Sequence, residues 1–224
     1  MDLNPKDLIL WSDEHLILIN KPPGLLTLPD GYDPSLPHLK SILEPAYGRL
    51  WIVHRLDRET SGIIVLGRSK DAHRQLNAQF EGRNVEKTYH ALVVGTPPWD
   101  EKRVEYPLLP DGDRMHRTVV DHKHGKASQT VFRVLRRFED HSLVEATPAT
   151  GRTHQIRAHL SAIGFPLIGD QLYGDKNHPS HCLLGRLGLH ALSLAFDHPH
   201  SSERVLFKAP YPNDFRGAIP DAVE

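Results

Sequence analysis

Short runs of apolar residues, separated by polar turns, dominate the first half of the chain and predict strands. Residues 8–11 and 16–19 are two such runs on either side of a polar turn, which predicts a β-hairpin. Residues 63–67 form a continuous run of branched side chains, typical of a buried strand. Residues 87–95 alternate at first and then become fully apolar, which predicts another buried strand.

Helical periodicity is clear in only two places. Between Ser69, a favourable N-cap, and Gly82, the apolar residues Ala72, Leu76 and Phe80 recur at every fourth position. Residues 154–163 repeat the pattern, with Gly164 just beyond the end. A weaker short helix is expected at residues 38–44, after a loop rich in proline, glycine and aspartate.

The second half returns to strands at hairpin spacing. The expected strands are residues 104–108, 127–135, 143–146, 187–196 and 203–208. The third of these pairs plausibly with the second, and the last with the one before it. Many strands with only two good helices predict an α+β fold, in which one domain over residues 1–224 is built on a mixed, mostly antiparallel sheet.

Composition excludes some classes of protein. With 224 residues, 39% hydrophobic and 25% charged, the chain is typical of a globular protein, and no run approaches the length of a membrane span. The N-terminus lacks a signal-peptide layout, and the single cysteine, Cys182, fits a reducing compartment, so a cytoplasmic location is expected. The net charge of −1 counts mildly against nucleic-acid binding, although clustering of charge matters more. The most basic loop region lies at residues 111–126, where a solvated loop and a contact with a phosphate backbone are equally open interpretations.

The segment 54–62, His-Arg-Leu-Asp-Arg-Glu-Thr-Ser-Gly, carries the strongest candidate for chemistry. Asp57 lies between Arg55 and Arg58, and nearby positive charge favours an ionised carboxylate suited to a nucleophile or an electrostatic stabiliser. Read alone, this pattern is more often a surface ion pair. Asp57 with Glu59 could also form a glycosidase pair, but residues two apart on a strand leave no space for a sugar between them.

Other kinds of site find little support. His178, His181 and Cys182 lie close together, and His154 and His159 share a helix, but no established zinc spacing occurs. No metal site is therefore expected. A phosphate-binding nucleotide loop and the G-x-S-x-G elbow of serine hydrolases are likewise missing from the sequence.

Several segments together resemble the RluA family of RNA pseudouridine synthases. Segment 54–62 is similar to the family signature around its aspartate. The other matching segments, in the family's order, are N-K-P-P-G at 20–24, K-T-Y at 87–89, G-R-T-H-Q-I-R at 151–157, G-D…Y-G at 169–174 and L-H-A at 189–191. The resemblance covers residues 8 to 210. It implies an isomerase that breaks the N1–C1′ bond of an RNA uridine, turns the uracil and joins C5 to C1′, without a cofactor.

The resemblance also implies roles for individual residues, around an active-site cleft across the sheet. Asp57 would be the essential carboxylate, acting as a nucleophile on sugar or base, or as the base that starts glycal formation. Tyr89 would stack on the target base and take part in removing the C5 proton. Arg152, just before a helix N-terminus that already favours an anion, would pair with Asp57. Arg55 would fill the gap left by a flipped base, and the expected RNA-binding set is His54, Arg55, Arg58, Lys21 and Arg157.

The expected partner is a stem-loop of ribosomal or transfer RNA with the target uridine flipped out, bound by a monomer. Some family members carry an N-terminal S4-type RNA-binding module, whereas this chain reaches its N-K-P-P-G segment by residue 24. Target selection is therefore expected to come from the catalytic domain and its loops. An RNA-binding protein on this fold that no longer catalyses is the alternative, and it has no need of Asp57, Tyr89 and Arg152 together.

Overall fold

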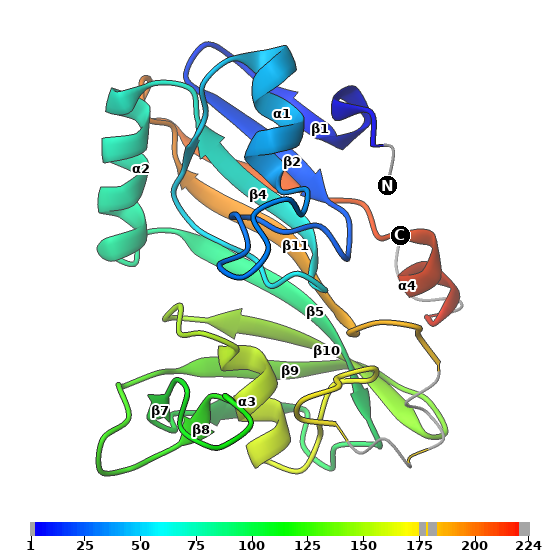
Figure 1. Cartoon of the computed structure of the whole chain (residues 1–224). Coiled ribbons are helices and arrows are strands. Elements are labelled where there is room, and N and C mark those ends of the chain that lie inside the picture. The colour runs from blue at the N-terminus through cyan, green and yellow to red at the C-terminus, as the bar shows by residue number, and fades with distance from the viewer. Residues whose placement is uncertain (1–2, 175–177, 179–182, 220–224) are drawn as a thin grey trace. The chain divides into compact units, whose positions relative to one another are not determined.

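The computed structural model describes residues 3–174, 178 and 183–219, and its helices and strands are drawn in Figure 1. The chain divides into two compact units. Unit 1 comprises Met1–Glu86 with Ala191–Pro210, and unit 2 comprises Lys87–His190 with Tyr211–Glu224. The prediction that residues 1–224 form one catalytic domain stays a prediction.

Unit 1 contains the predicted hairpin and the strands that extend it. The strand order is β1-β2-β4-β11, with β3 on β4 and β12 on β11. The strands are β1 (Ile9–Ser12), β2 (Leu16–Lys21), β3 (Trp51–Ile52), β4 (Ser61–Gly67), β11 (Leu189–Asp197) and β12 (Arg204–Lys208). The pairs β1–β2, β2–β4, β3–β4 and β11–β12 are antiparallel.

Burial explains the continuous apolar runs of unit 1. Ile63, Ile64, Val65 and Leu66 are all fully buried, so both faces of β4 are covered. Helix α2 (Lys70–Glu81) packs against β3 and β4 with Ala72 and Leu76 buried, and Ser69 is its N-cap as predicted. The remaining helices of unit 1 are η1 (Pro5–Leu8) and α1 (Leu39–Tyr47).

Unit 2 is built on the strand order β5-β10-β9-β6, and all three pairings are antiparallel. These strands are β5 (Glu86–Val94), β10 (His141–Pro148), β9 (Thr130–Arg137) and β6 (Glu101–Val104). A separate antiparallel ribbon joins β7 (Leu108–Leu109) to β8 (Val119–Val120). The helices are α3 (Gln155–Ala162) and α4 (Asn213–Gly217), shown in Figure 1.

The apolar half of β5 faces two different cores. Ala91 and Val93 pack with Ile156 and Leu160 of α3, whereas Leu92 and Val94 belong to a second cluster that includes Phe215 of α4. Alternate side chains of a strand point to opposite faces, so a strand covered on both sides is apolar throughout. The predicted α+β fold with a mostly antiparallel sheet and few helices is confirmed.

Some predicted boundaries are wrong. The expected strand 104–108 is two elements, because Val104 ends β6 and Leu108 begins the β7–β8 ribbon. Helix α1 continues through Pro45 to Tyr47, three residues beyond its expected end. Strand β3, strand β8 and helix α4 had no signal in the apolar pattern.

Candidate active site

Asp57 lies in the loop that connects β3 to β4 in unit 1. The Thr60 amide donates to the Asp57 carbonyl at 3.1 Å, which closes a turn over residues 57–60, and the residue is partly buried. The expectation that Asp57 and Glu59 share a strand is wrong, because both belong to this turn. Glu59 is exposed, and its carboxylate lies 3.7 Å from the Arg58 guanidinium.

Backbone-directed hydrogen bonds fix the Asp57 loop to the segment that follows β2. The Gly24 amide donates to the Arg58 carbonyl at 2.9 Å. The buried Thr27 hydroxyl donates to the Leu56 carbonyl at 2.9 Å and accepts from the Leu56 amide at 3.3 Å. Asp57 is therefore flanked by two anchored residues. This limits the motion of its backbone without using its carboxylate.

Lys21 is the third anchor and is fully buried. Its ammonium donates to the carbonyls of Pro22, Leu25 and Arg58, each at 2.9 Å. Three carbonyl oxygens match the three donors of a lysine and compensate much of the desolvation of its charge. The structure therefore gives Lys21 a structural role, and a side chain without exposed surface reaches RNA only if this loop rearranges, so its RNA contact stays a prediction.

The other basic residues of the motif differ in their environments. The His54 ring stacks on Phe80 of α2 with centroids 4.5 Å apart, and its Nε2 accepts from the Val65 amide at 3.1 Å. Arg58 donates from Nε to the Gly24 carbonyl at 3.1 Å. Arg55 is exposed. Of the three, His54 is committed to packing, whereas Arg55 and Arg58 present surface that RNA could contact.

Gly62 has a geometric role at the start of β4. Its φ is +112°, and a Cβ added there would lie 2.1 Å from the Ala191 carbonyl oxygen of β11. Only glycine allows both this conformation and this close approach. The Thr-Ser-Gly end of the motif therefore serves strand packing.

Tyr89 and Arg152 belong to unit 2. Tyr89 lies on β5 opposite Ala146 of β10, and it packs partly buried against the cluster that contains Ile156 of α3. Arg152 lies in the turn that leads into α3. Its Nε and Nη2 both donate to the Ala127 carbonyl at 3.2 Å. Tyr89 therefore packs beside Ile156 of α3, and Arg152 precedes the same helix in the chain.

Gln155 holds the turn that contains Arg152. Its side-chain oxygen accepts from the Thr150 hydroxyl at 2.7 Å and the Arg152 amide at 3.0 Å. Its amide nitrogen donates to Thr130, and the Thr130 hydroxyl contacts Nδ1 of the fully buried His159 at 2.9 Å. Burial lowers the pKa of His159, which favours its neutral imidazole in this network. Gln155 belongs to the G-R-T-H-Q-I-R segment, but nothing in the sequence indicates that its side chain holds the Arg152 turn.

Arg157 forms a buried ion pair. Its Nε and Nη2 donate to the two oxygens of the fully buried Asp170 carboxylate, both at 2.8 Å. Its guanidinium also lies over the Tyr173 ring, 5.1 Å from the centroid. Asp170 in turn accepts from the backbone amides of Leu172 and Tyr173. Arg157 therefore fastens the 169–174 loop to α3, and its predicted RNA contact stays a prediction.

Comparison with known proteins identifies the family of this chain. A family model described as RNA pseudouridylate synthase matches residues 15–162. The chain is 39% identical over 203 residues to the "Dual-specificity RNA pseudouridine synthase RluA" of Pasteurella multocida, covering 90% of this chain and 92% of that protein. The chain belongs to the RNA pseudouridylate synthase family. The predicted family and its RNA-modifying function are thereby confirmed.

Other relatives extend the comparison within the pseudouridine synthases. "Ribosomal large subunit pseudouridine synthase C" of Vibrio cholerae is 39% identical over 212 residues, and this chain covers 65% of its length. The solved structure "Human RNA Pseudouridylate Synthase Domain Containing 4" superposes with a TM-score of 0.78 at 27% identity, covering 96% of this chain and 93% of that one. "Human RNA Pseudouridylate Synthase Domain Containing 1" gives 0.79 at 26% identity, covering 94% and 86%.

Within this pseudouridine synthase fold, no group of three or more His, Cys, Asp or Glu side chains among the described residues could hold a metal ion. His181 and Cys182, two of the histidine and cysteine candidates, lie outside those residues. No helix in the described ranges is long and apolar enough to cross a bilayer. The joint geometry of Asp57 in unit 1 with Tyr89 and Arg152 in unit 2 stays a prediction.

Proposed function

We propose that this protein isomerises specific uridines in ribosomal or transfer RNA to pseudouridine, with Asp57 as the essential carboxylate. The observation that carries this proposal is the anchoring of the Asp57 turn by Lys21, Gly24 and Thr27. A carboxylate that must attack or deprotonate a substrate gains most from a backbone fixed beforehand. A relative named for the ribosomal large subunit supports ribosomal RNA as a substrate, and another is named as a dual-specificity RNA pseudouridine synthase.

The reaction is an isomerisation and needs no co-reactant. The N1–C1′ bond breaks, the uracil turns, C5 bonds to C1′, and the proton lost from C5 is balanced by one gained at N1. Asp57 acts as a nucleophile on the sugar or base, or as the base that forms a glycal. Tyr89 stacks on the uracil and assists removal of the C5 proton, and Arg152 pairs with Asp57. These roles rest on the match of the residues to the family motifs.

RNA is proposed to bind with its target uridine flipped out, because a base inside a stack cannot be reached by a carboxylate. The exposed side chain of Arg55 is suited to replace the stacking that the flipped base loses. We also propose a monomer acting in the cytoplasm. The single cysteine of the sequence is consistent with a reducing compartment.

Tritium release from RNA labelled at C5 of uridine tests the proposal. Ribosomal and transfer RNA from cells that lack the gene are incubated with the wild type, with Asp57→Asn and with Glu59→Gln. The wild type should release tritium from at least one RNA, and Asp57→Asn should lose roughly 10²–10⁴-fold in rate. Glu59→Gln, an exposed carboxylate of the same turn, is the matched control and should retain the rate.

Two outcomes would overturn the proposal. No release by the wild type from either RNA would exclude the activity on these substrates. Equal rates for wild type and Asp57→Asn would exclude Asp57 as the essential carboxylate. Retained RNA binding with no release would instead favour a binding protein on this fold.

A further inference from the structure

A basic turn lies between β8 and β9 in unit 2, at residues 121–126, Asp-His-Lys-His-Gly-Lys. Hydrogen bonds fasten both ends of the turn to residues 107–108, at the start of β7. The Asp121 amide donates to the Pro107 carbonyl at 3.0 Å, and Leu108 and Lys126 exchange amide-to-carbonyl bonds of 2.9 Å in both directions. The basic turn is therefore part of the β7–β8 ribbon, and its ends are held in place.

The interior of the basic turn is equally ordered. One oxygen of the Asp121 carboxylate accepts from the amides of Lys123 and His124 at 2.8 and 2.9 Å, and the Gly125 amide donates to the Asp121 carbonyl at 2.9 Å. A Cβ on Gly125 would lie 2.3 Å from that carbonyl oxygen and 2.8 Å from the Pro107 carbonyl carbon. These contacts give the turn a defined backbone conformation. A loose solvated loop would not need them.

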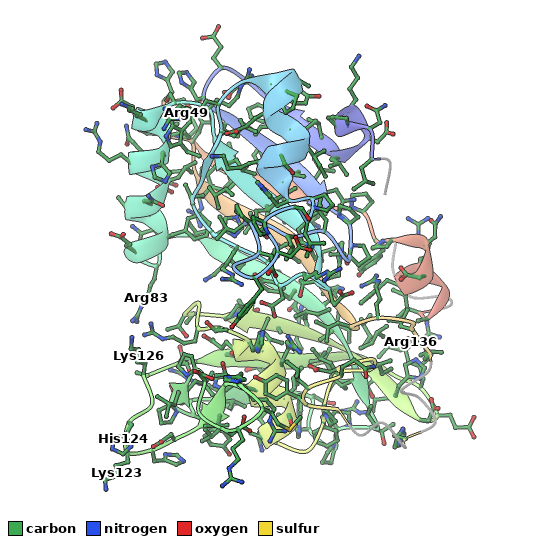
Figure 2. All side chains as sticks on the ribbon, viewed as in Figure 1. Arg49, Arg83, Lys123, His124, Lys126 and Arg136 are labelled. Atoms are coloured by element: carbon green, nitrogen blue, oxygen red, sulfur yellow. The ribbon has the colours of Figure 1, made fainter. Side chains whose placement is uncertain are left out.

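Carboxylates neutralise only part of the positive charge at residues 111–126. Arg117 pairs with Asp113 at 2.7 Å, and the imidazoles of His116 and His124 lie 2.5 and 3.5 Å from the Asp111 and Asp121 carboxylates. Lys123 and Lys126 are exposed, and neither ammonium has a carboxylate partner within the described ranges. Figure 2 shows Lys123, His124 and Lys126 along one loop, directed away from the ribbon.

The basic turn is joined directly to the candidate active-site arginine. Ala127, the residue after Lys126, provides the carbonyl that accepts both hydrogen bonds from the Arg152 guanidinium. The backbone that presents Lys126 therefore also positions Arg152. Lys126 therefore lies one residue from the carbonyl that holds the Arg152 guanidinium.

We propose that Lys123 and Lys126 form a docking surface for the phosphate backbone of the RNA strand that flanks the target uridine. The inference rests on the proposed function. Lysine ammonium groups act as point charges toward phosphate and read no base, so this surface contributes affinity and placement without sequence preference. It also accounts for RNA binding by a chain whose net charge is only −1.

The test removes the two charges and follows binding against salt. Lys123→Gln/Lys126→Gln is compared with the wild type by fluorescence anisotropy with a labelled RNA stem-loop that contains an unpaired uridine. Each lost phosphate contact lowers the slope of log affinity against log salt by about 0.7 on single strands and 0.9 on duplex. The double variant should therefore show a slope smaller by about 1.4–1.8. Its KM in tritium release should rise, while its kcat stays unchanged.

The matched control is Lys70→Gln/Lys208→Gln, which removes the same charge from two exposed lysines of unit 1. It should keep the wild-type slope. An unchanged slope in the Lys123/Lys126 variant would overturn the docking surface, and so would an equal reduction in the control, which would show a general charge effect. Because anisotropy measures binding without turnover, it decides the docking surface even if no RNA releases tritium. Conversely, an active wild type with an unchanged slope would refute the docking surface alone.

Discussion

Replacing Lys21 by methionine should loosen the turn that carries Asp57. The change keeps the side-chain volume but removes the ammonium that reaches three carbonyls. The Arg58 carbonyl keeps its bond from the Gly24 amide, so the part-buried carbonyl of Pro22 and the buried carbonyl of Leu25 lose a donor. At about 1–3 kcal/mol for each, the loss is about 2–6 kcal/mol. Relief of the desolvated charge offsets part of it, so we expect about 2–4 kcal/mol.

Urea unfolding and tritium release measure the two consequences of Lys21→Met. The free energy of unfolding should fall by the stated amount. The kcat should fall by about 10²-fold, because a displacement of about 1 Å in a catalytic group has that effect. Lys40→Met is the control, since its pair with Glu44 is a third exposed and contributes about 0.3–0.5 kcal/mol. The same unfolding midpoint for Lys21→Met and Lys40→Met would refute the structural role of Lys21.

Two further changes probe unit 2. Burial lowers the pKa of His159, so the unfolded chain binds a proton more readily, and stability should fall as the pH drops through about 6.5, the value expected for the unfolded chain. His159→Gln should lose less stability than the wild type between pH 7.5 and 5.5, and an equal loss would contradict the reasoning. Arg157→Met leaves the Asp170 carboxylate buried without its bidentate partner and should cost about 3–5 kcal/mol in urea unfolding. If it instead weakens RNA binding at unchanged stability, the original assignment of Arg157 to RNA was correct.

The apolar pattern predicted the elements whose burial is decided locally. Strand β4 and the end of β5 are apolar throughout because both of their faces are covered, and this can be read from the residues alone. The predicted strand at 104–108 is wrong because Val104 belongs to β6 and Leu108 belongs to the separate β7–β8 ribbon, with Pro107 between them. Helix α1 passes Pro45 because Leu39 and Leu43 are fully buried, and tertiary packing outweighed the local penalty of the proline.

The sequence predicts which segments form the candidate site, but not which groups each side chain in them contacts. The motifs predict Asp57, Tyr89 and Arg152 as site residues, which stays a prediction, while Thr27 lies outside all of the motifs. Thr27 anchors Leu56 across 29 residues of sequence, and no local pattern encodes such a contact. A motif therefore predicts that a residue belongs to a site more reliably than it predicts the partners of its side chain.

The basic residues show that positive charge alone does not identify an RNA contact in this chain. Lys21, Arg157 and Lys123 all stand in or near candidate segments, and all could bind phosphate. A cation whose donors are matched by buried protein acceptors is already compensated, and moving it to RNA would leave those acceptors unpaired. Lys21 with three carbonyls and Arg157 with both oxygens of Asp170 are of this kind, whereas Lys123 is exposed and has no carboxylate partner within the described part of the chain. The acceptors around a cation, and not its place in a motif, therefore distinguish a cation already paired inside the protein from one whose charge is available to RNA.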